Sequence, residues 1–207
     1  SLIQLSKRIP GLIFIDRYIE DVSEKCVWLD NLEGGKIAAR HLLTLGHKNL
    51  AFINSDYEID EPKLRFEGFN QVIESANLSI DSTLNVHNAP TLQGGELAAQ
   101  ALLAQHKSFS CVFAYNDAMA IGAISVFEDN GYKVPSDISV IGFDDVLLSQ
   151  YSRPKLTTLR YPIAEMATHA AQRAIAFSSN QEPPKSHLKY LPSIVKREST
   201  TGNNQTE

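Results

Sequence analysis

The hydrophobic positions of this chain follow two alternating patterns. Short continuous apolar runs such as GLIFID (11–16), KNLAFIN (48–54) and CVFAYN (111–116) predict buried strands. Between such runs, apolar residues recur every three or four positions, as in DAMAIGAISVFEDNG (117–131), which predicts amphipathic helices. Strands that alternate with helices across short connections predict an α/β fold with parallel sheets and right-handed crossovers.

The predicted elements cover nearly the whole chain. Strands are expected at 11–16, 26–30, 48–54, 83–88, 111–116, 138–144 and 155–162, with one or two closing strands in 187–200. Helices are expected from Asn31 to a C-cap at Gly46, and at 62–76, 92–106, 117–131 and 163–178. The polar tail TGNNQTE (201–207) is predicted to be disordered.

Four predicted strands end in a carboxylate or amide side chain. These ends are Asp16-Arg17, Asp30-Asn31, Asn116-Asp117 and Asp144-Asp145. Each pair by itself is explained as an N-cap of the next helix or turn, and Asn31 and Asp117 are expected to be caps of some kind. Because ligands of parallel sheets collect beyond the carboxyl ends of the strands, the four pairs together predict a polar-lined cleft.

A cleft of this composition suits a neutral ligand with many hydroxyl groups, such as a sugar, because carboxylates and amides can bridge adjacent hydroxyls. Arg65, in the helix start KLRFEGF, either adds guanidinium donors to that cleft or is a solvated helix arginine. The aromatic residues Tyr115, Tyr161 and Trp28 either stack on a sugar face or lie in the core.

Composition removes several other functions. The net charge of -5 and the pI of about 5.7 argue against a nucleic-acid surface on this chain. Cys26 and Cys111 lie in apolar runs, which favours buried free thiols in a reducing compartment. No apolar run reaches the ~18 residues of a membrane span, and the N-terminus lacks a signal-peptide layout. The cytoplasm is therefore the expected location.

The sequence carries no motif of a known catalytic or cofactor site. G-x-S-x-G, the Walker phosphate loop and G-x-G-x-x-G are absent, and the six histidines are not paired at metal-ligand spacing. Gly34-Gly35 and Gly94-Gly95 predict close helix packing instead. The chain is expected to be no enzyme and to hold no metal or cofactor, although the sequence leaves a paired-carboxylate glycosidase site open.

Several motifs resemble one family of bacterial regulators. DNLEGGKIAARHLLTLGHKNLAFI, RFEGF, YNDAMAIGA, VPSDISVIGFDD, RPKLTTLRYPI and LPSIVKREST occur in this order between Gly11 and Thr200. They closely resemble the effector-binding domain of lac/gal-type transcription repressors. The run from YNDAMAIGA to TTLRYPI is most similar to the galactose repressor and isorepressor branch.

This resemblance implies two parallel-sheet lobes of the type I periplasmic-binding-protein kind, which close around a small ligand. A partial N-terminal lobe is expected at 1–80 and a C-terminal lobe at 81–200, with passages between lobes near 155–162 and 187–200. The family's DNA-binding head and the first section of its N-terminal lobe have no counterpart here. Operator DNA is thus expected to be bound only by the missing head, and a homodimer is expected for the intact parent.

The resemblance also implies roles for individual residues. Asp144, Arg65 and Asn116 match positions that face the ligand in the family. Asp16 and Tyr161 match further positions that line the same pocket, whereas Asp145 is expected to hold the turn. The expected function is binding of a sugar effector, D-galactose or a related sugar. A periplasmic sugar-binding protein of a transport system and a sugar-processing enzyme are the alternatives.

Overall fold

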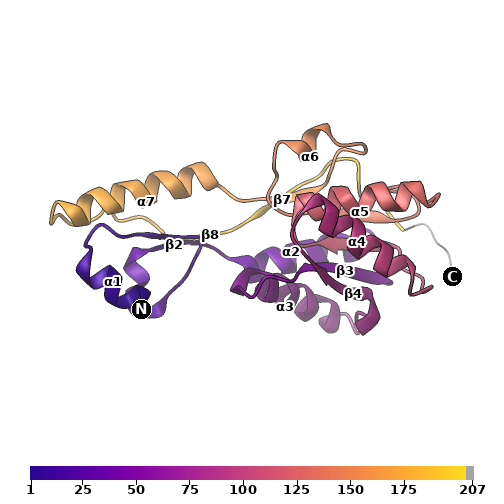
Figure 1. Ribbon diagram of the computed structural model, residues 1–207, viewed down its shortest axis with the longest axis horizontal. Coiled ribbons are helices and arrows are strands. Elements are labelled where there is room, and N and C mark those ends of the chain that lie inside the picture. The colour runs from indigo at the N-terminus through magenta and orange to yellow at the C-terminus, as the bar shows by residue number, and fades with distance from the viewer. Residues whose placement is uncertain (204–207) are drawn as a thin grey trace. The chain divides into compact units, whose positions relative to one another are not determined.

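The computed structural model describes residues 1–203 and divides the chain into two compact units (Figure 1). The smaller unit contains Ser1–Asp30 and Tyr161–Pro192, and the larger unit contains Asn31–Arg160 and the chain from Ser193 onward. The predicted lobe boundary near residue 80 is therefore corrected to Asp30. The reason is that β3 (Leu50–Ser55) pairs with both β4 (Asn85–Asn88) and β5 (Cys111–Ala114), so that residues before and after 80 share one sheet.

The larger unit is built on a four-stranded parallel sheet of order β4-β3-β5-β6, where β6 is Ser139–Ile141. Among the described residues, the α-helices of this unit are α2 (Asn31–Thr44), α3 (Asp60–Ser75), α4 (Leu92–Leu103), α5 (Asp117–Asp129) and the short α6 (Leu148–Tyr151). A 3₁₀ turn, η2 (Ser82–Leu84), precedes β4. The predicted strands and long helices of this region are confirmed, whereas α6 was not predicted.

Alternate side chains of the sheet enter two apolar layers, as the strand period requires. Phe52 and Phe113 contact Phe69 of α3 at ring-centroid distances of 5.5 and 5.3 Å. Their strand neighbours Ile53 and Ala114 belong instead to the core formed with α4 and α5. Helices thus cover both faces of the sheet, and the strand ends are left to form a site.

Glycines let neighbouring helices approach closely. A Cβ atom at Gly35 of α2 would lie 2.0 Å from the carbonyl oxygen of Arg65 in α3. A Cβ atom at Gly95 of α4 would lie 2.2 Å from the carbonyl oxygen of Met119 in α5. Both distances are far below van der Waals contact, so the predicted role of these glycines in helix packing is confirmed.

The smaller unit contains a three-stranded parallel sheet of order β1-β2-β8. Its strands are β1 (Phe14–Ile15), β2 (Cys26–Leu29) and β8 (Lys189–Tyr190), and its helices are α1 (Leu2–Arg8), the 3₁₀ helix η1 (Glu20–Lys25) and α7 (Ile163–Ser178). The sequence patterns did not predict α1 or η1. Helix α1 begins with a capping box, in which Ser1 and Gln4 bond each other's backbone N–H groups.

Two short strands accompany the passages between the units. β7 (Thr158–Arg160) pairs antiparallel with β9 (Ser193–Val195), so the expectation of parallel pairing does not extend to them. The chain leaves the larger unit after Arg160 and re-enters it at Ser193. These strands lie at two of the three covalent connections between the units; the third joins Asp30 to Asn31.

The start of the C-terminal tail is ordered against the larger unit. The Thr201 amide donates to Ser139 Oγ over 3.0 Å, and the Asn203 amide donates to the Leu45 carbonyl over 2.8 Å. The prediction of disorder is therefore wrong for residues 201–203, because local composition carries no information about these distant partners. Residues 204–207 of the predicted tail lie outside the described residues.

Two further expectations concern chemistry rather than topology. Cys26 and Cys111 are both buried and free, as predicted. Burial raises the pKa of the Cys26 thiol and, more strongly, that of the Cys111 thiol, so both side chains act as small apolar groups. Within residues 1–203, the helices are all too short or too polar to traverse a bilayer.

Candidate functional site

Arg65 lies in α3 and is buried, with 4% of its side chain exposed. Its Nε atom donates a hydrogen bond to Asn31 Oδ1 over 2.9 Å. Its Nη1 atom donates to the carbonyl oxygen of Tyr115, the residue after β5, over 2.6 Å. Arg65 is therefore no solvated helix arginine: it connects the first residue of α2 to the carboxyl end of β5.

The guanidinium of Arg65 is also held between aromatic rings. It lies 3.6 Å from the Phe143 ring centroid and 4.4 Å from the Tyr115 ring centroid. Its Nη2 atom lies 3.7 Å from Asp144 Oδ1, and 27% of the Asp144 side chain is exposed. A buried, fully oriented cation thus lies beside a carboxylate that solvent can reach, at the end of the sheet.

The turn that presents Asp144 has an unusual backbone. Asp144 has φ of 112° and Asp145 has φ of 55°, both in the region that L-residues other than Gly rarely adopt. The Asp144 amide donates to the Leu159 carbonyl over 2.8 Å, which ties this turn to β7. Strained backbone of this kind concentrates at functional sites and persists only where surrounding contacts hold it.

Asn116 is the N-cap of α5. Its Oδ1 accepts a hydrogen bond from the Met119 amide over 2.9 Å, and its Nδ2 donates to the Pro90 carbonyl over 3.2 Å. The capping alternative from the sequence is therefore observed for Asn116. Asn31, which was expected to be a cap of some kind, is the first residue of α2, and its Oδ1 accepts the hydrogen bond from Arg65.

Asp117 follows this cap and is completely buried. Its Oδ1 accepts from Thr158 Oγ1 over 2.5 Å, and its Oδ2 accepts from the Val146 amide over 2.9 Å. Burial raises the pKa of Asp117 to about 7; the two hydrogen bonds oppose that effect, and the carboxylates of Asp144 and Asp145 add to it. Asp117 lies below the turn rather than at its surface.

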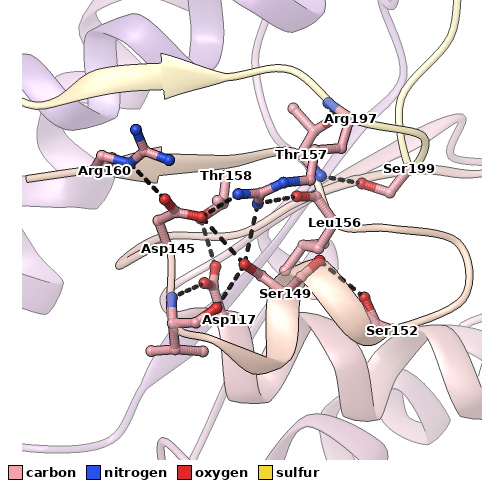
Figure 2. Close-up of polar contacts among 11 residues, drawn as sticks. Asp117, Asp145, Ser149, Ser152, Leu156, Thr157, Thr158, Arg160, Arg197 and Ser199 are labelled. Atoms are coloured by element: carbon pink, nitrogen blue, oxygen red, sulfur yellow. Dashed lines mark hydrogen bonds and ion pairs between the residues drawn. The ribbon is translucent and has the colours of Figure 1, made fainter.

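The side chain of Asp145 points into a cluster of polar side chains (Figure 2). It forms ion pairs with Arg160 and Arg197, each at 2.5 Å. Burial would raise the pKa of Asp145, but the hydrogen bonds and charges of Arg197 and Arg160 outweigh it and hold the pKa below the ordinary range. The two adjacent aspartates therefore differ in environment, since only Asp144 is directed to the exposed strand end.

The fold agrees with comparisons to known proteins. A family model described as the periplasmic binding protein-like domain matches residues 39–200. The chain belongs to this family. It is 38% identical over 201 residues to the HTH-type transcriptional regulator GalR of Escherichia coli K12, a match that covers 97% of this chain and 59% of GalR.

Two further matches agree with this assignment, the second in its fold alone. The chain is 36% identical over 192 residues to the HTH-type transcriptional regulator GalS of Salmonella typhimurium, with 93% of this chain and 56% of GalS covered. A crystal structure of a LacI-family sugar-binding transcriptional regulator from E. coli, complexed with phosphate, superposes with a TM-score of 0.90 at 24% identity, over 98% of this chain and 74% of that one. The chain spans less than two thirds of the length of the curated regulators that it matches.

In this periplasmic binding protein-like chain, the predicted site residues divide between the two units. Arg65, Asn116 and Asp144 lie in the larger unit, and the structure brings Arg65 and Asp144 into contact. Asp16 and Tyr161 lie in the smaller unit. Asp16 follows β1 with φ of 58° and donates its amide to the Val27 carbonyl over 2.8 Å, while the Tyr161 carbonyl accepts from the Ile163 amide over 2.9 Å.

The aromatic residues named from the sequence have partners within their own units. Trp28 packs against Tyr18 at a centroid distance of 4.9 Å, and Tyr115 is buried beneath Arg65. Asp30 pairs with Lys189 over 3.2 Å. Among residues 1–203, no cluster of three or more His, Cys, Asp or Glu side chains is arranged to hold a metal ion.

Sequence reasoning missed Arg160 and Arg197, which bind Asp145. Both lie in motifs quoted for the family resemblance, TTLRYP and VKREST. Neither is next to one of the four predicted strand ends that carry an Asp or Asn side chain. Arg160 belongs to β7 and Arg197 lies two residues after its partner strand β9, and both arginines contact the same carboxylate.

Proposed function

We propose that this chain is the sugar-binding effector domain of a bacterial transcriptional regulator of carbohydrate utilisation, with D-galactose or a closely related sugar as its effector. The observation that carries the proposal is the contact between Arg65 and Asp144 at the carboxyl end of a parallel sheet in a periplasmic binding protein-like fold. Support for galactose comes from the similarity to GalR and GalS and from the sequence resemblance to the galactose repressor branch.

The chemistry of this pair suits a polyhydroxylated ligand. An ionised carboxylate accepts several hydrogen bonds, whereas a guanidinium only donates. Asp144 can therefore accept a hydrogen bond from one sugar hydroxyl while Arg65 donates one to the next hydroxyl. Arg65 is already oriented by Asn31 and Tyr115, so little side-chain entropy remains to be lost when a ligand binds. We propose that Asn116, Asp16 and Tyr161 contribute further contacts to the same sugar.

For an intact regulator we propose a two-state switch. Sugar binding favours one arrangement of the two units, and that arrangement changes the affinity of a separate DNA-binding head for its operator. The change can be no larger than the difference between the sugar affinities of the two states. The intact protein is expected to act in the cytoplasm as a homodimer, and the chain is expected to have no enzymatic activity.

The direct test is a calorimetric titration of this chain with D-galactose, glucose and ribose near neutral pH. D-Galactose is expected to produce heat of binding, and Asp144→Asn is expected to weaken binding at least about tenfold, the usual cost of removing a charged hydrogen-bond partner. Asp129→Asn, at an exposed position of α5, is the matched control and is expected to bind as the parent does. An unchanged affinity in Asp144→Asn would remove Asp144 from the site.

The alternative of a sugar-processing enzyme makes a different prediction for the same protein sample. A sugar-processing enzyme would convert a galactoside during incubation, whereas an effector domain is expected to return the sugar unchanged. Absence of binding heat with all three sugars would contradict the proposal that this chain binds a galactose-type effector by itself.

A further inference from the structure

The turn carries two aspartates, and Asp145 is the one that is not part of the proposed sugar site. Its side chain is only 4% exposed, and each of its oxygens contacts a different arginine. Oδ1 accepts from Arg197 Nη2 and, over 3.2 Å, from Ser149 Oγ, whereas Oδ2 accepts from Arg160 Nε. A buried carboxylate with this many charge-assisted bonds fixes the atoms around it.

Arg197 is the more buried of the two arginines, with 13% of its side chain exposed against 56% for Arg160. Its Nη1 atom also donates to Ser149 Oγ over 3.0 Å and to the Leu156 carbonyl over 2.9 Å. Exposed ion pairs contribute little to stability. The ion pair of Asp145 with the more buried Arg197 is therefore expected to restrain Asp145 more than its ion pair with Arg160 does. Figure 2 shows these bonds converging on the turn from β7, α6 and the segment after β9.

β7 and the two residues before it run alongside this turn. The carbonyls of Thr157 and Leu159 accept from the amides of Gly142 and Asp144 over 3.0 and 2.8 Å. The alternate side chains of the same stretch, Thr158 and Arg160, bond Asp117 and Asp145. Backbone and side chains together therefore fasten this segment to the turn that presents Asp144.

The same segments are two of the three places where the chain passes between the units; the third is Asp30–Asn31. Arg160 is the last residue before the chain leaves the larger unit, and Arg197 comes four positions after the re-entry at Ser193. We propose that Asp145 is a positioning residue that locks the Asp144 turn to both passage segments through Arg160 and Arg197. A sugar bound at Asp144 would then act on the passages through this lock; this inference rests on the proposed function of Asp144.

The positive φ angles of Asp144 and Asp145 explain why such a lock is needed. An L-residue in this region is strained by contacts of its Cβ, and the turn relaxes unless its surroundings hold it. Removing Arg197 also leaves the buried charge of Asp145 with only its exposed cationic partner, Arg160. The expected consequence is increased local mobility of residues 143–146, while the rest of the sheet is unaffected.

The first test requires no sugar. Hydrogen exchange of the amides of Asp144 and Val146 is expected to accelerate at least about tenfold in Arg197→Met, relative to amides in the centre of β3. Lys107→Met is the matched control, because it breaks another ion pair of the larger unit, the 2.6 Å contact with Asp81, without touching the turn. Equal acceleration at the turn and in β3 would overturn the lock.

Two further variants separate positioning from general stability. Arg197→Lys keeps the charge but lacks the guanidinium fork, so its exchange rates at the turn are expected to lie between those of the parent and Arg197→Met. Arg160→Met removes only the exposed partner and is expected to fold even where Arg197→Met does not, with a smaller acceleration confined to the same amides. No acceleration at the turn in any of these variants would overturn the inference.

The second test uses D-galactose and the parent chain as reference. Arg197→Met is expected to weaken sugar binding about tenfold, although Arg197 is not part of the proposed sugar site. The double variant with Asp145→Asn is expected to lose less affinity than the sum of the two single losses. Unchanged affinity in Arg197→Met would overturn the coupling. Absence of binding in the parent would contradict the proposed function alone, since the exchange experiment judges the lock without sugar.

Discussion

Thr158 Oγ1 donates a 2.5 Å hydrogen bond to Asp117 Oδ1, and solvent reaches neither residue. This bond joins the first residue of α5 to the first residue of β7, directly beneath the turn of Asp144 and Asp145. Because burial raises the pKa of Asp117 to about 7, the carboxyl group changes its charge near neutral pH. The burial of Asp117 therefore makes the stability of the larger unit dependent on pH, and the hydrogen bond from Thr158 reduces that dependence.

The first prediction concerns Asp117→Asn. The folded pKa of about 7 lies above the ordinary value of 3.8, so the folded chain binds the proton more tightly than the unfolded chain. The stabilisation is complete below about pH 4 and is lost as pH rises through 7, with a slope of up to about 1.4 kcal/mol per pH unit. The free energy of unfolding of the parent minus that of Asp117→Asn should fall across this range in urea titrations. A constant difference from pH 4 to 8 would show that Asp117 stays ionised in the folded chain.

The second prediction concerns Arg65→Lys. Lysine cannot reproduce the bonds of Nε and Nη1 to Asn31 and Tyr115 or the stacking on Phe143, and it leaves buried acceptors unsatisfied. The free energy of unfolding is expected to fall by about 2–4 kcal/mol, measured by urea denaturation. Arg40→Lys, at an exposed ion pair with Glu33, should change it by less than about 0.5 kcal/mol. Similar losses in both variants would show that Arg65 behaves as a surface arginine.

The third prediction concerns His41, whose Nε2 lies 2.9 Å from Thr200 Oγ1. Burial, together with the charges of Lys196 and His47, lowers the pKa of His41 to about 4. The unfolded chain then binds the proton more tightly, so the fold loses stability as pH falls from about 6.5 towards 4. The difference in unfolding free energy between the parent and His41→Gln is expected to shrink over this range and to stay constant above pH 7. A difference that does not vary below pH 6.5 would contradict the lowered pKa.

The fourth prediction concerns the close packing of α4 on α5. Gly95→Ala places a methyl group 2.2 Å from the Met119 carbonyl oxygen, so the two helices have to separate. The expected cost is about 1–3 kcal/mol of unfolding free energy, the usual range for overpacking. Gln100→Ala, an exposed position of the same helix, serves as control and is expected to be neutral or slightly stabilising. If Gly95→Ala were as stable as this control, backbone contact at Gly95 would not limit how closely α4 and α5 approach each other.

Local pattern predicted most of the larger unit correctly. Continuous apolar runs identified β3 and β5, and the period of apolar residues identified α4 and α5. Gly46, the predicted C-cap, and Gly131, the last residue of the predicted helix 117–131, have φ of 85° and 87°. Periodicity and caps depend on residues within one turn or one strand, so a single sequence contains the information. Helices α1 and α6 were missed because each is short and partly exposed, and thus lacks a clear apolar period.

The sequence by itself determined the α/β class, the polar residues at the strand ends, and the two buried free thiols. Tertiary structure decided which of those residues meet: Arg65 bonds Tyr115, 50 positions away, and Arg197 bonds Asp145, 52 positions away. It also decided that the chain divides after Asp30 rather than near residue 80, because β3 is hydrogen-bonded between β4 and β5. Side-chain pairs of this kind follow from strand order and register, which are set by packing between segments far apart in the chain and leave no local pattern in it.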